Sequence, residues 1–271
     1  MTDQPRITLN DGNRMPQLGY GVFLVPPEET KRLVAEAIDV GYQAIDTATF
    51  YRNEAEVGAA IRESGRRPFV TTKLLNEDQG YDNALKAFDA SYEALGLDVI
   101  DLYLIHWPKP KQDLYRESWK ALVRLREEGR VRSIGVSNFT MAHLETIIHD
   151  TGVVPAVNQI ELHPYFQQVE SRAFHDENKI VTTSWSPLGR GGVLDDPQIA
   201  QIARKHGKTP AQIILRWHVD CRLTVIPKSS SRARQVENLD IFGFRLDAQD
   251  MHTIAGLDRT DGRIGPDPDL F

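Results

Sequence analysis

Short apolar runs alternate with amphipathic helical stretches from about residue 18 to residue 240. This alternation is typical of repeated strand–helix units that build a parallel sheet. The candidate strands are Leu18–Gly21, Ala44–Asp46, Phe69–Lys73, Val99–His106, Val131–Val136, Val157–Ile160, Val181–Trp185 and Thr224–Pro227. Eight strands with helices between them and no break in composition predict an α/β fold, a single (β/α)8 TIM barrel over residues 1–271. The usual length of that fold is about 250 residues.

The stretches between the strands carry helical periodicity. Residues 30–40, 54–62 and 115–128 each place apolar side chains on one face, and Gly41 and Gly129 follow two of them. An apolar stripe predicts a helix that packs on the sheet, and a glycine suits the left-handed position that ends such a helix.

Two segments lie outside the alternation. Residues 7–15 place Asp11-Gly12 between short strand-like runs, which predicts a β-hairpin that plugs the bottom of the barrel. Residues 248–257 predict an extra C-terminal helix, and residues 261–271, rich in Gly and Pro, predict an irregular tail.

Composition excludes several classes of protein. The net charge is −6, from 32 basic and 38 acidic residues that are well mixed, so we expect neither nucleic acid nor a membrane surface as a partner. The single cysteine, Cys221, cannot form an intramolecular disulfide or a cysteine-rich zinc site. Met1–Pro5 does not begin a signal peptide, and no run approaches about 18 apolar residues. We expect a cytoplasmic monomer.

Titratable side chains stand at or just beyond the ends of three predicted strands. They are Asp46, Tyr51, Lys73 and His106. In a barrel of this kind the C-terminal ends of the strands meet at one mouth, where active sites lie. Taken alone, the aspartate could be a helix cap and the lysine a solvated charge, but four such residues at one mouth favour a catalytic site.

These four residues form a set that can protonate an oxyanion. A tyrosine with its ordinary pKa near 10 is a poor acid, but the Lys73 ammonium would lower that pKa by stabilising the phenolate. Asp46 would orient the lysine, and His106 could donate a hydrogen bond to a substrate carbonyl. Since the set contains no nucleophile and no side chain delivers hydride, a cofactor must supply it. No G-x-G-x-x-G fingerprint or P-loop is present.

Several motifs resemble those of the aldo-keto reductases, in the same order along the chain. They are Gly41–Ala48 with Tyr51, Asn53-Glu54 and Val57-Gly58, then Thr71–Leu74, Asp101–Pro108, Gly135–Phe139, Asn158–Pro164 and Ile226–Ser229. Within that family, the stretches Leu9–Asn13, Pro16–Phe23, Gly152–Gln159 and Gly207–Gln212 are similar to prokaryotic 2,5-diketo-D-gluconate reductases. The resemblance covers residues 7–257, nearly the whole chain.

The resemblance implies a role for each site residue. Tyr51 would be the general acid, Asp46 and Lys73 its tuning pair, and His106 the residue that orients the carbonyl. For the cofactor, Ser137, Asn138 and Gln159 would hold the nicotinamide carboxamide and Trp185 would stack on the ring. Ser186, Leu188 and Gly189 would lie over the pyrophosphate. Lys228, Ser229, Ser230 and Arg234 would face a 2′-phosphate, with Glu237 and Asn238 at the adenine.

The cluster at residues 228–234 decides between the two nicotinamide cofactors. It gathers Lys228, Arg232 and Arg234 with three serines, which suits a 2′-phosphate and favours NADPH (NADP+) over NADH. A charge run of this kind is ordinarily the solvated start of a helix. Trp185 could likewise be an ordinary core aromatic.

The expected function is NADPH-dependent reduction of aldehydes and ketones, with 2,5-diketo-D-gluconate or other small α-dicarbonyls as candidate substrates. The expected pocket residues are Phe23, Phe50, Leu75, His106 and Trp107. Leu75 and Phe50 depart from the diketogluconate reductases, as does Gln43-Ala44, which puts sugar-acid specificity in doubt. The short segment Lys109–Asp113 and the brief tail predict an open pocket and broad substrate acceptance.

Two other functions are compatible with a barrel of this kind. A metal-dependent barrel hydrolase would also use Asp, Lys and His, but no His-x-His motif or carboxylate cluster accompanies His106, so we expect no metal. A non-catalytic, nucleotide-binding regulatory barrel is the other alternative, and the intact set of four residues argues against it.

Overall fold

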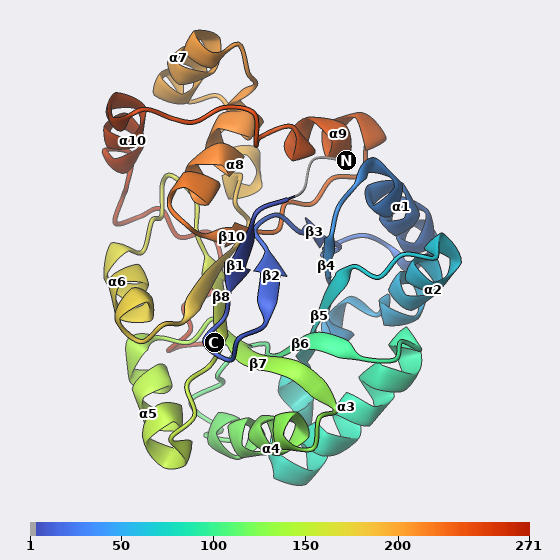
Figure 1. Cartoon of the computed structure of the whole chain (residues 1–271). Helices are drawn as coiled ribbons and strands as arrows, with labels where there is room; N and C mark the ends of the chain where they lie inside the picture. The colour runs from blue at the N-terminus through green and yellow to red at the C-terminus, as the bar shows by residue number, and fades with distance from the viewer. Residues whose placement is uncertain (1–3) are drawn as a thin grey trace.

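The computed structural model describes residues 4–271, so most of the opening segment Met1–Pro5 lies outside the described part. Its main sheet has eight parallel strands, which follow one another in chain order around the sheet (Figure 1). They are β3 (Tyr20–Gly21), β4 (Ala44–Asp46), β5 (Phe69–Leu74), β6 (Ile100–Ile105), β7 (Val131–Ser137), β8 (Val157–Glu161), β9 (Val181–Trp185) and β10 (Thr224–Val225). Each predicted strand is present, and the first and last are shorter than predicted.

The sheet closes on itself through the segments beside β3 and β10. Leu18 and Val225 form a parallel bridge, and the Gly19 amide donates to the Val225 carbonyl at 2.8 Å. The Gly21 amide then donates to the Pro227 carbonyl at 3.1 Å. A Cβ atom at Gly21 would lie 2.9 Å from the carbonyl oxygen of Ile226, so this close approach requires glycine. The predicted (β/α)8 barrel is confirmed.

Helices surround the sheet on its outer side (Figure 1). They are α1 (Pro27–Val40), α2 (Glu54–Ser64), α3 (Tyr81–Leu95), α4 (Tyr115–Glu127), α5 (Met141–Thr151), α6 (Val169–Glu177), α7 (Pro197–His206), α8 (Pro210–Asp220), α9 (Arg232–Leu239) and α10 (Ala248–Ala255). The apolar stripe predicted in the first of them is buried, and Gly41 ends that helix with φ of 125°. Helix α10 is the predicted extra C-terminal helix. No helix within residues 4–271 has both the length and the apolar character needed to cross a membrane.

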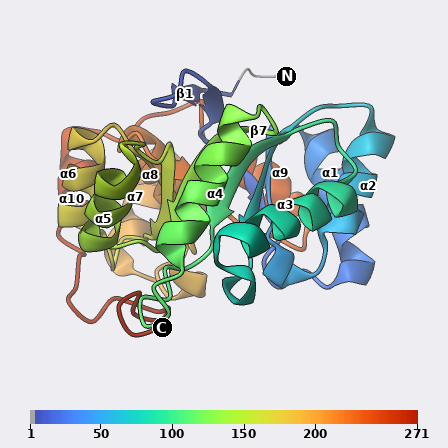
Figure 2. The ribbon, with the colours of Figure 1, turned by 90° about the horizontal axis from the view of Figure 1, so that it is seen from below.

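The N-terminal hairpin closes one end of the barrel. Strands β1 (Arg6–Thr8) and β2 (Arg14–Pro16) pair antiparallel, and the side chains of Leu9 and Met15 are buried. They share an apolar cluster with residues near the N-terminal starts of the strands, among them Ala44, Phe69 and Val157. Figure 2 shows the hairpin and the C-terminus at opposite ends of the barrel. The predicted plug is therefore present, and the C-terminal strand ends form the open mouth.

Candidate active site

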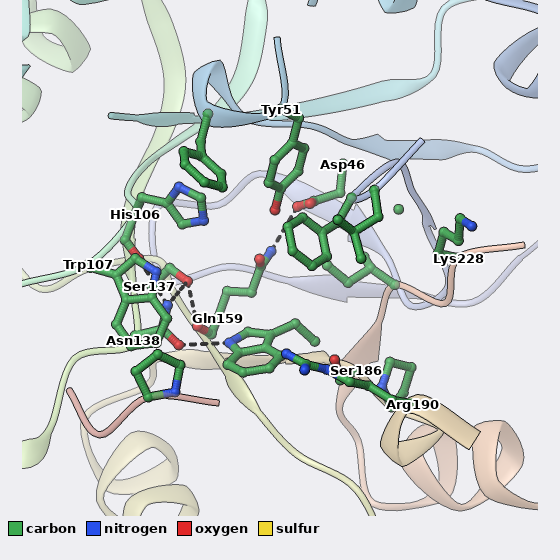
Figure 3. Close-up of a pocket in the computed structure, with 18 of the residues that line it drawn as sticks. Asp46, Tyr51, His106, Trp107, Ser137, Asn138, Gln159, Ser186, Arg190 and Lys228 are labelled. Atoms are coloured by element: carbon green, nitrogen blue, oxygen red, sulfur yellow. Dashed lines mark hydrogen bonds between the residues drawn. The ribbon is translucent and has the colours of Figure 1, made fainter. Parts of the chain in front are cut away.

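Three consecutive strands bring the four predicted catalytic residues to the mouth. Asp46 is the last residue of β4, Lys73 lies in β5, and His106 directly follows β6. Tyr51 ends a short 3-10 helix, η1 (Thr49–Tyr51), that follows β4. The Tyr51 and His106 rings have centroids 5.8 Å apart, and both line one cavity with Asp46 (Figure 3).

A buried ion pair lies behind the tyrosine. The Lys73 ammonium donates to the Asp46 Oδ1 at 2.6 Å and to the Thr47 carbonyl at 2.8 Å, and the lysine is fully buried. These two bonds leave one of its three N–H donors free, and its Nζ lies 5.1 Å from the centroid of the Tyr51 ring. The second oxygen of Asp46 accepts from the Gln159 amide at 2.8 Å, a bond that the sequence analysis did not predict.

Burial sets the protonation of these groups. It raises the pKa of the Tyr51 phenol, and the Lys73 ammonium opposes this rise without cancelling it, so the net direction is opposite to the one expected from the sequence. Desolvation alone would lower the pKa of Lys73, but Asp46 and Tyr51 reverse the effect and the pKa is raised. Desolvation, helped by Lys73, lowers the pKa of His106 to about 3. The tyrosine is therefore protonated, the lysine charged and the histidine neutral near pH 7.

A buried asparagine fixes the loop that carries Tyr51. The Asn53 side-chain amide donates to the carbonyls of Val22 and Val25, each at 3.3 Å, and its oxygen accepts from the Thr47 hydroxyl at 2.8 Å. Since these partners belong to two different strand-to-helix loops, Asn53 joins them behind the tyrosine. These hydrogen bonds satisfy both ends of the Asn53 amide, which explains why a buried polar residue is tolerated there.

The mouth encloses a cavity of about 460 Å³ with mostly apolar walls. All five predicted pocket residues line it. Other lining residues were not predicted from the sequence, among them Leu24, Asn76, Pro266 and Phe271. The last two belong to the tail (residues 261–271), so the tail forms part of the wall. An open pocket was predicted from the shortness of the tail, and this contribution of the tail to the wall was not foreseen.

The residues expected at the nicotinamide come together on β7, β8 and β9. The Asn138 amide nitrogen donates to the Ser137 hydroxyl and to the His106 carbonyl, each at 3.0 Å. Its oxygen accepts from the Trp185 indole at 2.7 Å (Figure 3). Asn138 has φ of 63°, a left-handed conformation that asparagine adopts more easily than most residues. Gln159 lines the same side of the cavity.

The residues expected at the phosphates and the adenine divide into two groups. Ser186, Leu188 and Lys228 line the cavity, and Gly189 has φ of 55° in the loop after β9. The others follow β10 without lining the cavity; they are Ser229, Ser230, Arg234, Glu237 and Asn238. All three cations of this segment are exposed; Arg232 pairs with Asp39 at 2.6 Å, and Lys228 donates to the Ser230 hydroxyl at 2.8 Å.

Within residues 4–271, no group of three or more His, Cys, Asp or Glu side chains is arranged to hold a metal ion. His163, which follows β8, is buried, and its Nε2 lies 3.1 Å from the Glu161 carboxylate. The donor set that remains, hydroxyls, amides, an indole and exposed cations along one cavity, fits a dinucleotide better than a metal.

Comparison with known proteins identifies the family. The model of the aldo/keto reductase family matches residues 17–259. An aldo-keto reductase of Mycolicibacterium smegmatis is 54% identical over 270 residues, which are 98% of each chain. The methylglyoxal reductase DkgA of Yersinia pestis is 49% identical over 276 residues, covering 100% of this chain and 99% of that one. The crystal structure of a Gox0644 mutant in complex with NADPH superposes with a TM-score of 0.97 at 53% identity, over 99% of both chains. The chain therefore belongs to the aldo/keto reductase family, and it is an NADP-dependent oxidoreductase that reduces carbonyl groups.

Proposed function

We propose that this chain reduces small aldehydes and ketones, α-dicarbonyls among them, with Tyr51 as the proton donor. The observation that carries the proposal is the buried Lys73–Asp46 pair behind a protonated tyrosine, at the same cavity as a neutral His106. Methylglyoxal, the substrate in the name of the Yersinia pestis relative, is the first substrate to test.

Each residue has a separate task in this mechanism. His106, being neutral, keeps one ring N–H that can donate to the substrate carbonyl oxygen and hold it beside the phenol. Bound NADPH supplies the hydride. As negative charge develops on the carbonyl oxygen, Tyr51 delivers its proton there, and the Lys73 ammonium stabilises the phenolate that is left. Asp46 keeps the ammonium in place through its 2.6 Å bond.

The cofactor would lie along the wall formed by β7, β8, β9 and the loop after β10. Ser137, Asn138 and Gln159 offer hydroxyl and amide groups for the carboxamide, and Trp185 offers a flat face for the ring. Ser186, Leu188 and Gly189 would surround the pyrophosphate. Beyond them, Lys228, Ser229, Ser230 and Arg234 would bind the 2′-phosphate, and Glu237 and Asn238 the adenine.

The replacement Tyr51→Phe tests the proposal. It removes the proton donor and keeps the ring, so we expect kcat with methylglyoxal and NADPH to fall about a thousandfold. NADPH binding, followed by quenching of tryptophan fluorescence, should not change. Turnover within tenfold of the unmodified protein would remove Tyr51 from its role, and no oxidation of NADPH by the unmodified protein with a panel of carbonyls would overturn the function itself.

The domain organisation, the location in the cell and the oligomeric state are also part of the proposal. We propose that residues 1–271 act as one domain, and that the protein is a cytoplasmic monomer. The single cysteine agrees with a reducing compartment. One cooperative unfolding transition and a monomer mass by light scattering are the expected measurements.

A further inference from the structure

A buried carboxylate outside the proposed mechanism holds the C-terminal tail. Glu161 is the last residue of β8 and is 2% exposed. Its Oε1 accepts from the Ile264 amide at 2.6 Å and its Oε2 from the Gly265 amide at 2.7 Å. Both oxygens therefore bind backbone N–H groups of the tail, more than 100 positions later in the chain.

The carboxylate is held in its charged form. Burial would raise the pKa of Glu161, but His163 and the two tail amides outweigh burial and lower it. Hydrogen bonds from backbone N–H groups to an ionised acceptor are about twice as strong as neutral ones. Glu161 thus gives the tail an anchor of a kind that irregular surface segments normally lack.

The tail's other hydrogen bonds to the barrel lie near its end and are exposed. The Lys111 ammonium donates to the Leu270 carbonyl at 3.3 Å, and the Thr140 hydroxyl donates to the Asp269 carboxylate at 3.3 Å. Exposed bonds of this kind contribute little because water competes for both partners. The buried bonds of Glu161 are therefore the main polar attachment of the tail.

The tail packs against both tryptophans of the pocket. Glu161 is the register partner of Trp185 on the next strand, and Gly265 lies directly against that indole. A Cβ atom at Gly265 would be 2.5 Å from Trp185 and 2.9 Å from the Glu161 carboxylate. Farther along, the Phe271 ring packs on Trp107 with 4.7 Å between centroids, where it lines the cavity.

We propose that Glu161 is a positioning residue that fastens the tail as a wall of the substrate pocket, against which the apolar part of a bulky carbonyl substrate binds. This inference rests on the proposed function, because it concerns the substrate of the same site. A substrate as small as methylglyoxal fills little more than the space between Tyr51 and His106. An aromatic α-dicarbonyl such as phenylglyoxal extends toward Phe271 and Trp107.

Kinetics with both substrates test the proposal in Glu161→Gln, with Glu170→Gln as the matched control. Glu170 is exposed in the first turn of α6. We expect KM for phenylglyoxal to rise about tenfold in Glu161→Gln, with kcat and the KM for methylglyoxal changed less than about twofold. The control should behave as the unmodified protein. An unchanged KM for phenylglyoxal, or an equal rise for both substrates, would overturn the proposal.

Proteolysis gives a readout that does not depend on activity. Trypsin cleaves after Arg263, an exposed residue next to the anchored amides, and releases residues 264–271. We expect Glu161→Gln to be cut there at least about tenfold faster than the unmodified protein and the control, because cleavage follows local opening. Equal protection would refute the anchor, and it would do so even if the proposed reductase function failed.

A second variant covers the case in which Glu161→Gln does not fold. Gly265→Ala leaves the carboxylate intact and adds a methyl group where Trp185 leaves no room. It should reproduce the tryptic cleavage and the selective rise in KM for phenylglyoxal. If the tail is released in Gly265→Ala and the KM for phenylglyoxal stays unchanged, the proposal is wrong. In a chain that ends at Thr260, Glu161→Gln should add no further change in KM for phenylglyoxal, since the tail is already missing.

Discussion

At the closed end of the barrel, the side chains of Leu9 and Met15 are buried in an apolar cluster. At the open end, a lysine and an aspartate are buried side by side, and the backbone of Asn138 is left-handed. Burial of apolar surface stabilises the fold, whereas buried charges and strained backbone cost free energy. The closed end therefore contributes stability, and the open end uses part of that stability to hold reactive groups.

The largest effect is expected at the open end. Lys73→Met leaves the Asp46 carboxylate buried without its cation, so we expect the free energy of unfolding to fall by about 3 to 5 kcal/mol, and kcat to fall with it. The measurements are urea denaturation and NADPH oxidation. The double variant Asp46→Asn/Lys73→Met should recover much of the stability and none of the activity. A single variant as stable as the unmodified protein would break the contrast.

The pH dependence of stability should come from buried histidines that lie outside this apolar cluster. Burial lowers the pKa of His175 to about 4 and that of His218 to about 3. Between these values and about 6.5 the unfolded chain binds more protons than the folded one, so stability rises with pH. From pH 6.5 down to pH 5 we expect a loss of about 3 kcal/mol for the two histidines together.

Denaturation midpoints measured across this range check the expectation, with His218→Gln as the diagnostic variant. The His218 Nε2 lies 3.3 Å from the Pro187 carbonyl, and a glutamine amide can donate to the same oxygen. His106, whose pKa is also lowered to about 3, contributes in the same way, so the variant should lose about a third of the pH dependence that the three histidines produce. If the full dependence remains, His218 is not its source.

A smaller effect is expected at the closed end. Met15 is 2% exposed, and Met15→Ala opens a cavity in the apolar cluster. We expect a loss of about 2 kcal/mol in the free energy of unfolding, with kcat and KM unchanged at temperatures where the variant is folded. A change in kcat would show that the closed end also affects catalysis, and the division of tasks between the two ends would be wrong.

The smallest effect concerns the cofactor segment at the edge of the mouth. Arg234→Ala removes a guanidinium expected at the 2′-phosphate, so the KM for NADPH should rise about tenfold. The KM for NADH, which lacks that phosphate, should stay the same. Arg232→Ala is the matched control because Arg232 is already paired with Asp39. Equal effects of Arg234→Ala on both cofactors would refute the assignment.

The sequence was sufficient to predict those site residues that the barrel fold itself brings to the mouth. Asp46, Lys73 and His106 stand at the C-terminal ends of strands, and such ends meet at one mouth whatever the loops do. The closed end was predictable for a similar reason, since Asp11-Gly12 between two short runs is a local hairpin signal.

Other features depend on distant partners and could not be predicted. The bond from Gln159 to Asp46 spans 113 positions, and no local pattern announces it. The tail has no periodicity, so neither its anchor on Glu161 nor the contact of Phe271 with Trp107 was foreseen. The pKa of Tyr51 was misjudged because the sequence showed the nearby cation and not the depth of burial.

The way the ring closes also bears on how the protein folds. Strands β3 and β10 are two residues each, and the segments beside them are far apart in the sequence. For example, the Gln17 side-chain amide donates to the Leu223 carbonyl over 206 positions. During synthesis, β3 can therefore be joined to β10 only after nearly all of the barrel has left the ribosome. Contacts of such high sequence separation form slowly, so ring closure is expected to be a late step of folding. Until that step, the sheet has two open edges, and the nascent chain is then most exposed to wrong pairing with other chains.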